Sequence, residues 1–272
     1  MRTVDISNLT EAQATLLMPL WARAVENRRP NPLIIDHKAV AIVDDLDFDF
    51  DVFIQRRVPQ ADYCIRATVL DRLVLEFLEK NPDGTVVEFG VGLDTRFDRL
   101  DNNRVTWIEI DLPHVIDLRL QFFEATNRRH ILSGSLLDEE WIDQVKQIRR
   151  GPTLFLAEGV LYFLAATQVD TLLEELVEHF PESAFLFDTQ SPWFLWFSNL
   201  RQPVKNAQMK FSVGDVRDLS ERHPRVRVHR WIGFGDSPYY DRTLHRVSRL
   251  KRLARRCFTA IRSMFKIIEL RW

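Results

Sequence analysis

The sequence predicts an α/β protein with a doubly wound parallel sheet, because short apolar segments alternate with helical segments between residues 85 and 188. A second indication is Gly90-Val91-Gly92, where the first of these apolar segments stops and a helix begins. The chain has 272 residues, 46% of them hydrophobic, which is enough for one large domain with a substantial core.

The segment that precedes this region is expected to be helical. Apolar residues recur there at helical spacing in three stretches, and segments rich in proline, asparagine and aspartate end them. The three helices are expected at about 11–27, from about Asp36, and at about 60–80. We therefore expect residues 1–84 to form a helical cap, or lid, on a core of residues 85–272.

The strands of the predicted sheet are short, mostly apolar and followed by helices. Strands are expected at 85–90, 105–111, 130–134, 153–158, 184–188, 226–231 and 265–270. Helices are expected after Gly92 and at about 114–126, 138–148, 167–180 and 243–258.

The turn after the first strand of the sheet indicates a ligand site. Gly90 and Gly92 lack side chains at the carboxyl end of a buried strand, where α/β sheets bind small molecules. A dinucleotide site would require a third glycine where Thr95 stands, and its pyrophosphate would be repelled by Asp94. A ligand with an ammonium and a sulfonium group avoids that repulsion. The turn therefore favours S-adenosylmethionine over NAD.

An acidic residue at the end of the second strand supports this interpretation. Asp111 follows Gly92 by 19 residues (111 − 92), about where nucleoside sites place the carboxylate that accepts both ribose hydroxyls. The alternative is purely structural: the glycines form a tight turn, Asp94 or Thr95 caps a helix, and Asp111 ends a strand.

Composition excludes several classes of function. The net charge of −2 gives no field that would attract nucleic acid, although residues 242–271 are strongly basic. The two cysteines, Cys64 and Cys257, lie far apart and suggest neither a disulfide framework nor a metal site. Because no run of about 18 apolar residues occurs, we expect a cytoplasmic protein without membrane insertion.

Several motifs in this order resemble the leucine carboxyl methyltransferase family, and within it the bacterial branch similar to tetracenomycin-type polyketide O-methyltransferases. They are Arg23-Ala24, Arg29-Pro30, Asp36, Asp47-Phe48-Asp49-Phe50, Arg66, Asp71, Val87 to Arg96, Asp111-Leu112-Pro113, Trp141-Ile142-Asp143 and Glu158-Gly159-Val160-Leu161. The resemblance implies a seven-stranded class I methyltransferase (Rossmann-like) sheet whose last strand, 265–270, is antiparallel.

The resemblance also implies S-adenosylmethionine as the cofactor and assigns its contacts. Arg66 would hold the carboxylate of the cofactor, and Gly90, beside Gly92, would lie against its methionine part. Asp111 would bind the ribose, and Ser135 and Leu136 would flank the adenine. Glu158 would face the amino group. Where the family often has an acidic residue this chain has Ser135, so the adenine amino contact falls to Asp138 or to backbone.

The chemistry of methyl transfer requires few catalytic side chains, because a dry pocket that aligns acceptor, methyl group and sulfur supplies most of the acceleration. A carboxylate acceptor is already ionised at neutral pH and needs no general base, whereas a phenol does. The seven histidines show no shared spacing. We therefore assign no catalytic residue, and we expect Arg66 and Tyr162 to position a small, polyketide-like carboxylate.

Other acceptors and roles stay open. They are a phenol or other hydroxyl, a protein C-terminal carboxylate, and a non-catalytic binding module attached to membranes through the basic segment 242–258. The aromatic residues of 188–197 could form the wall of an acceptor pocket or pack in the core. The helix expected over 243–258 could dock its apolar stripe on the sheet. The sequence leaves the oligomeric state open.

Overall fold

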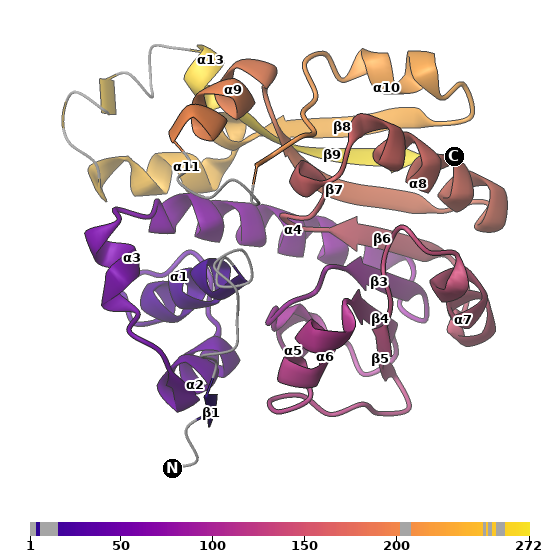
Figure 1. The fold of residues 1–272 in the computed structure, drawn as a ribbon, viewed down its shortest axis with the longest axis horizontal. Helices are drawn as coiled ribbons and strands as arrows, with labels where there is room; N and C mark the ends of the chain where they lie inside the picture. Colours follow the sequence, from indigo (N-terminus) through magenta and orange to yellow (C-terminus); the bar gives the residue numbers. More distant parts are fainter. Residues whose placement is uncertain (1–3, 6–15, 202–207, 247–248, 250–251, 254–258) are drawn as a thin grey trace.

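A seven-stranded sheet forms the centre of the computed structural model, which describes residues 4–5, 16–201, 208–246, 249, 252–253 and 259–272. The strands lie in the order β5-β4-β3-β6-β7-β9-β8 (Figure 1). Their bounds are β3 Thr85–Phe89, β4 Thr106–Asp111, β5 Arg129–Ser133, β6 Thr153–Ala157, β7 Ala184–Gln190, β8 Arg227–Gly233 and β9 Phe265–Arg271. The predicted α/β sheet and its seven strands are confirmed. A separate parallel pair, β1 Val4–Asp5 and β2 Leu46–Asp47, was not predicted.

The connectivity places the end of β3 at a topological switch point. The strands β3 to β7 are all parallel, with β4 and β5 on one side of β3 and β6 and β7 on the other. Because the chain leaves β3 and β6 in opposite directions across the sheet, a crevice opens between their carboxyl ends. The last strand, β9, is antiparallel to both its neighbours, as expected.

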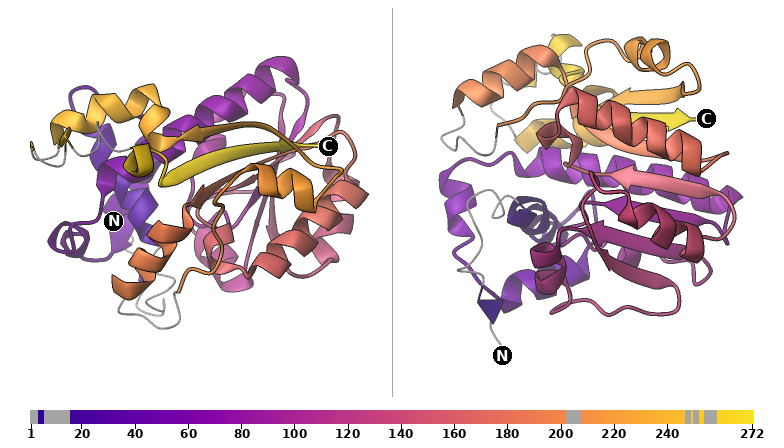
Figure 2. Two further views of the ribbon diagram at one scale, coloured as in Figure 1. Left: turned by 90° about the horizontal axis from the view of Figure 1, so that it is seen from above. Right: turned by 45° about the vertical axis from the view of Figure 1, so that its right-hand side comes forward.

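The two faces of the sheet carry separate cores, because side chains alternate along each strand. Val86, Trp107 and Leu154 pack on one face with residues of α1 (Leu17–Asn27) and α4 (Gln60–Lys80). Val87 and Phe155 pack on the other with residues of α7 (Glu140–Ile148) and α8 (Ala166–His179), so helices cover both faces (Figure 2).

The N-terminal helices gather around α4 (Figure 1). They are α1, α2 (His37–Asp45) and α3 (Asp51–Gln55). Asp36 caps α2 by accepting a hydrogen bond from the backbone N–H of Ala39 at 2.9 Å. Since apolar residues of α4 share a core with the sheet, this helix joins the N-terminal helices to the strands. The proposed boundary at residue 84 stays a prediction.

One predicted helix is shorter than expected. The helix expected over 114–126 is α6, Pro113–Arg119, and turns follow it. After α6 the chain folds back, and the ring of Phe123 lies 4.1 Å from the guanidinium carbon of Arg119 and 4.6 Å from that of Arg129. These cation–π contacts fix the loop.

The C-terminal part differs from the sequence prediction in its helices. The helices α9 (Pro192–Arg201) and α10 (Arg217–Arg222) were not predicted, and the helix expected after Gly92 without stated bounds is α5 (Arg96–Leu100). In the region expected to be helical over 243–258, α11 (Pro238–Thr243) precedes a 3-10 turn, η5 (Leu244–Arg246), and most of the remainder lies outside the described residues. A further short helix, α13 (Thr259–Arg262), leads into β9. No helix in the described ranges is long and apolar enough to cross a membrane.

A buried ion cluster supports the turn at the end of β3. Glu109 of β4 is fully buried and pairs with Arg119 at 2.6 Å and with Arg129 at 2.9 Å. Arg119 also donates a hydrogen bond to the carbonyl oxygen of Gly92 at 2.8 Å. The carboxylate of Glu109 therefore holds the guanidinium group that anchors the glycine turn.

We expect Glu109→Gln to lower the free energy of unfolding by about 3–5 kcal/mol, because it leaves two buried guanidinium groups without their carboxylate. Urea unfolding followed by circular dichroism measures this loss. The matched control is Glu124→Gln at an exposed position. Equal stability of the two variants would show that the cluster contributes little.

Candidate active site

A cavity of about 280 Å³ lies at the carboxyl ends of β3, β6 and β7. One end is polar and the other is mostly aromatic. Of the eight residues assigned from the sequence to binding or positioning the ligands, five line this cavity: Arg66, Gly90, Gly92, Glu158 and Tyr162. Three do not line it: Asp111, Ser135 and Leu136.

The polar end is built around Arg66, which reaches across from α4 to the end of the sheet. Its Nε lies 2.8 Å from Oε1 of Glu158, and its Nη1 lies 3.0 Å from Oδ2 of Asp188. Burial would lower the pKa of Arg66, but Asp188 and Glu158 raise it above the ordinary value. The guanidinium group therefore stays charged at the floor of the cavity.

Asp188 is the last charged residue of β7 and organises its neighbours. The Tyr162 hydroxyl donates to Oδ2 of Asp188 at 2.6 Å, and the backbone N–H of Gly159 donates to Oδ1 at 2.6 Å. Burial and the charge of Asp188 raise the pKa of Tyr162 well above its ordinary value. Tyr162 thus stays protonated and is held in one orientation.

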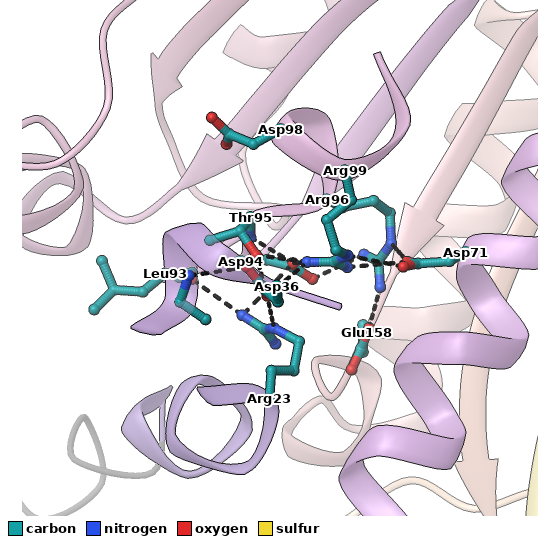
Figure 3. A network of polar contacts seen from close by, with 12 residues as sticks. Arg23, Asp36, Asp71, Leu93, Asp94, Thr95, Arg96, Asp98, Arg99 and Glu158 are labelled. Atoms are coloured by element: carbon teal, nitrogen blue, oxygen red, sulfur yellow. Dashed lines mark hydrogen bonds and ion pairs between the residues drawn. The ribbon is translucent and has the colours of Figure 1, made fainter. Parts of the chain in front are cut away.

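Arg96, the first residue of α5, connects four carboxylates. It pairs with Asp71 at 2.7 Å and with Asp94 at 2.9 Å, and it also contacts Glu88 and Glu158. Figure 3 shows its side chain and that of Arg99 converging on Asp71 from α5. The helices α4 and α5 and the ends of β3 and β6 are therefore joined by one guanidinium group.

Asp94 remains ionised inside the turn. Burial would raise its pKa, but Arg96, Arg23 and Arg99 hold it well below the ordinary range. A second carboxylate, Asp36, pairs with Arg23 at 2.8 Å and with Arg99 at 3.1 Å (Figure 3). The turn that would contact a ligand therefore carries a fixed negative charge.

The glycine turn has a backbone conformation that favours glycine at both positions. Gly90 has φ +59° and Gly92 has φ +51°. A Cβ atom at Gly90 would also lie 2.3 Å from Cγ2 of Val160, so that side chain already fills the space beside the backbone. At Gly92 the nearest atom to such a Cβ would be Cβ of Leu16, at 3.7 Å. Of the two, only Gly92 leaves room above its α-carbon.

Asp111 closes the same turn from the neighbouring strand. Its Oδ2 accepts a hydrogen bond from the backbone N–H of Gly92 at 2.7 Å, and its Oδ1 accepts one from Leu112 at 2.7 Å. Burial raises the pKa of Asp111. The backbone N–H of Gly134 donates to the carbonyl oxygen of Asp111 at 2.9 Å, which brings the loop with Ser135 and Leu136 beside it. These residues therefore form a second group next to the cavity.

The aromatic end of the cavity combines residues from distant parts of the chain. Phe194 of α9 packs on Phe265 of β9 with ring centroids 4.8 Å apart, and Phe234 packs on Phe265 at 5.2 Å. Four aromatic residues of 188–197 could, from the sequence, form a pocket wall or pack in the core. Of these, Phe194 lines the cavity, whereas Trp193 and Trp196 are 46% and 65% exposed and Phe197 is also exposed.

Sequence reasoning missed several residues of the site. Arg96 stood within the glycine motif, but its charge gave no indication of its four partners. Asp188 and Gln190 end β7 in the same way that Glu158 follows β6, so polar residues at strand ends were a signal that could have found them. Glu88 lies inside an apolar strand and is the fourth site residue that sequence reasoning missed.

Comparison with known proteins gives the family. The Leucine carboxyl methyltransferase family matches residues 16–177, which is more than half of the chain. The Tetracenomycin polyketide synthesis O-methyltransferase TcmP of Streptomyces glaucescens is 32% identical over 234 residues, which cover 85% of this chain and 86% of the relative. The S-adenosyl-L-methionine-dependent methyltransferase dpfgK of Gibberella zeae is 27% identical over 80% of this chain and 81% of its own length.

A solved structure agrees on the fold. An S-adenosylmethionine-dependent methyltransferase from Anabaena variabilis superimposes with a TM-score of 0.50 at 12% identity and covers 74% of this chain and 84% of its own. At that identity the likeness shows the fold alone. With the family match and the sheet order described above, the chain belongs to the leucine carboxyl methyltransferase family and is an S-adenosylmethionine-dependent methyltransferase with the class I fold.

Proposed function

We propose that the acceptor is a carboxylate of a small specialised, polyketide-like metabolite, which is converted to its methyl ester. The observation that carries this proposal is the composition of the cavity wall: among the described residues that line it there is no histidine, lysine or cysteine. Tyr162 is held protonated by Asp188, and Glu158 and Asp94 are engaged with arginines. An acceptor that is already ionised needs no base from this wall, in which Glu158 and Asp94 are held by arginines and Glu88 is assigned below to the cofactor. The name of TcmP supports a polyketide acceptor.

The charge balance of the polar end supports binding of the cofactor there. In the described network, six carboxylates surround four guanidinium groups, so negative charge is in excess even while Glu88 holds a proton, with five charged carboxylates against four guanidinium groups. The carboxylates are Asp36, Asp71, Glu88, Asp94, Glu158 and Asp188; the guanidinium groups are Arg23, Arg66, Arg96 and Arg99. A ligand with ammonium and sulfonium charges compensates that excess, whereas a pyrophosphate would increase it.

An unpaired oxygen of Glu88 also supports binding of the cofactor at the polar end. Its Oε2 is buried without a hydrogen-bond partner among the described residues, and the side chain lines the cavity. An amino group of the cofactor would satisfy that oxygen. We propose that Glu88 and Glu158 receive the amino group, Arg66 the carboxylate and Gly92 the methionine backbone, with Gly90 beside it.

The adenosine half is proposed to lie on the second group of residues. Asp111 would accept the ribose hydroxyls with the lone pairs that its two backbone contacts leave, and Ser135 and Leu136 would flank the adenine. When bound, S-adenosylmethionine supplies a methyl group that passes to a carboxylate oxygen as the carbon–sulfur bond breaks, which leaves the methyl ester and S-adenosylhomocysteine. Because no proton moves, the protein needs only to align the two molecules and exclude water.

We expect Asp111→Ala to weaken S-adenosylmethionine binding by about 10- to 100-fold, the loss of charge-assisted hydrogen bonds to the ribose. Isothermal titration calorimetry measures the change. The control is Asp117→Ala, at an exposed position of α6. Thermal unfolding of both variants checks that the turn at Gly92 survives. Unchanged affinity of the Asp111→Ala variant for S-adenosylmethionine would contradict the proposed contact between Asp111 and the ribose.

If the acceptor is a carboxylate, the rate of methylation should depend little on pH, whereas for a phenol it should fall steeply as the pH is lowered. With methyl-labelled S-adenosylmethionine at saturation, methylation of 2-naphthoic acid should change little between about pH 7 and about pH 5.5, since carboxyl groups ionise near pH 4. Methylation of 2-naphthol should be slow and should fall about ten-fold per pH unit. Base-labile label identifies the ester. Stable ether as the main product would favour the phenol alternative.

Burial raises the pKa of Glu88 to about 8, with Asp94 and Glu109 acting in the same direction and Arg96 against them. In the unfolded chain Glu88 loses its proton near pH 4.5, whereas in the folded protein it keeps the proton up to about pH 8. The free energy of unfolding therefore falls as the pH rises from about 4.5 to about 8. Glu88→Gln should remove this decline, whose slope is at most about 1.4 kcal/mol per pH unit. Urea unfolding at several pH values measures it against Glu140→Gln, an exposed control. Parallel curves for wild type and Glu88→Gln would contradict the raised pKa.

A further inference from the structure

Gln190 is a buried amide that the proposed cofactor contacts do not use. It is the last residue of β7, it is fully buried, and it lines the cavity. Its Oε1 has no hydrogen-bond partner among the described residues. Its Nε2 lies 2.8 Å from Sδ of Met209, and a thioether is only a weak acceptor. A buried oxygen left without a donor costs about 1–3 kcal/mol, so it indicates a ligand that supplies one.

The amide is held in place by the segment that crosses the end of β7. The backbone N–H of Val213 donates to the carbonyl oxygen of Gln190 at 3.1 Å. Met209 is fixed in turn by Asn199 of α9, through hydrogen bonds of 3.0 and 2.7 Å between the Asn199 side chain and the Met209 backbone. The unpaired oxygen is therefore presented by a rigid frame.

The surroundings of Gln190 define the shape of the partner. Phe194, Phe234 and Phe265 line the same cavity; Phe265 is the register partner of Gln190 on β9 and packs on both other rings. Phe163 also lines the cavity and is 40% exposed, so the cavity opens to solvent beside it. Aromatic side chains arranged in this way bind flat apolar rings.

We infer that Gln190 is the positioning residue of an acceptor subsite, and that the acceptor is a planar aromatic acid with a ring hydroxyl that donates to the amide oxygen. This rests on the proposed function. A carboxylate that is about to be methylated can only accept hydrogen bonds, so it cannot satisfy an amide oxygen. The donor must be a second group on the same molecule, and a hydroxyl is the simplest group that serves.

The test compares two ligands that differ in one hydroxyl, 6-hydroxy-2-naphthoic acid and 2-naphthoic acid; at this position the hydroxyl lies too far from the carboxylate to donate to it. Each is titrated calorimetrically into full-length protein saturated with S-adenosylhomocysteine, so that no turnover is needed. The wild type should bind the hydroxylated acid about ten-fold more tightly. Gln190→Met should bind the two acids equally while its affinity for S-adenosylhomocysteine stays within about two-fold of wild type. Gln147→Met, at an exposed position of α7, is the control and should keep the preference.

The other outcomes separate the two proposals. If S-adenosylhomocysteine binds but the wild type shows no preference, or binds neither acid, the subsite inference is wrong and the cofactor assignment stands. A preference that persists in Gln190→Met also overturns the role of Gln190. If the wild type binds both acids with the expected preference but methylates only hydroxyls in the naphthol experiment, the carboxylate proposal fails and the subsite stands.

Discussion

The Arg96 guanidinium group is the contact on which the polar end of the cavity depends. It joins α4 through Asp71, β3 through Glu88, the glycine turn through Asp94 and the end of β6 through Glu158. Burying four carboxylates together would be very costly without a central cation, because each would lose its hydration and repel the others. With Arg96 in place, the segments that meet at the switch point are held together before any ligand arrives, and the site is therefore preorganised.

The same network sets the sign of the local field. Since the carboxylates outnumber the arginines that enter from α1, α4 and α5, one end of the cavity carries an excess of negative charge, and the other end has an apolar wall. One cavity thus presents two kinds of surface, which suit the proposed charged cofactor and the proposed flat acceptor. Both surfaces lie at the carboxyl ends of β3, β6 and β7, which share one edge of the sheet.

Much of this could be predicted from the sequence. The strands follow from β-branched runs, the turn from Gly90 and Gly92, and the family from motifs that the comparisons then confirmed. The roles of Arg66, Asp111 and Glu158 remain predictions. Other features could not be predicted, because they depend on contacts between segments that are distant in sequence. Phe265 reaches Phe194 and Phe234 only through the antiparallel insertion of β9, and in the turn after α6 Phe123 contacts two arginines from different elements. No local pattern contains that information.

The antiparallel direction of β9 has a consequence for how such a protein can diversify. Because this strand runs against β7, it is its first residue, Phe265, that reaches the cavity, together with Gln190, Phe194 and Phe234 from the same half of the chain. All four lie beyond residue 177, where the family match ends, while Arg23, Arg66, Arg96 and Glu158 lie within it. The aromatic end of the cavity is thus encoded mainly in a different stretch of the gene from the polar end, to which the C-terminal third adds Asp188. Under the proposed function, substitutions at the aromatic end would alter the acceptor while most of the proposed cofactor contacts stay unchanged.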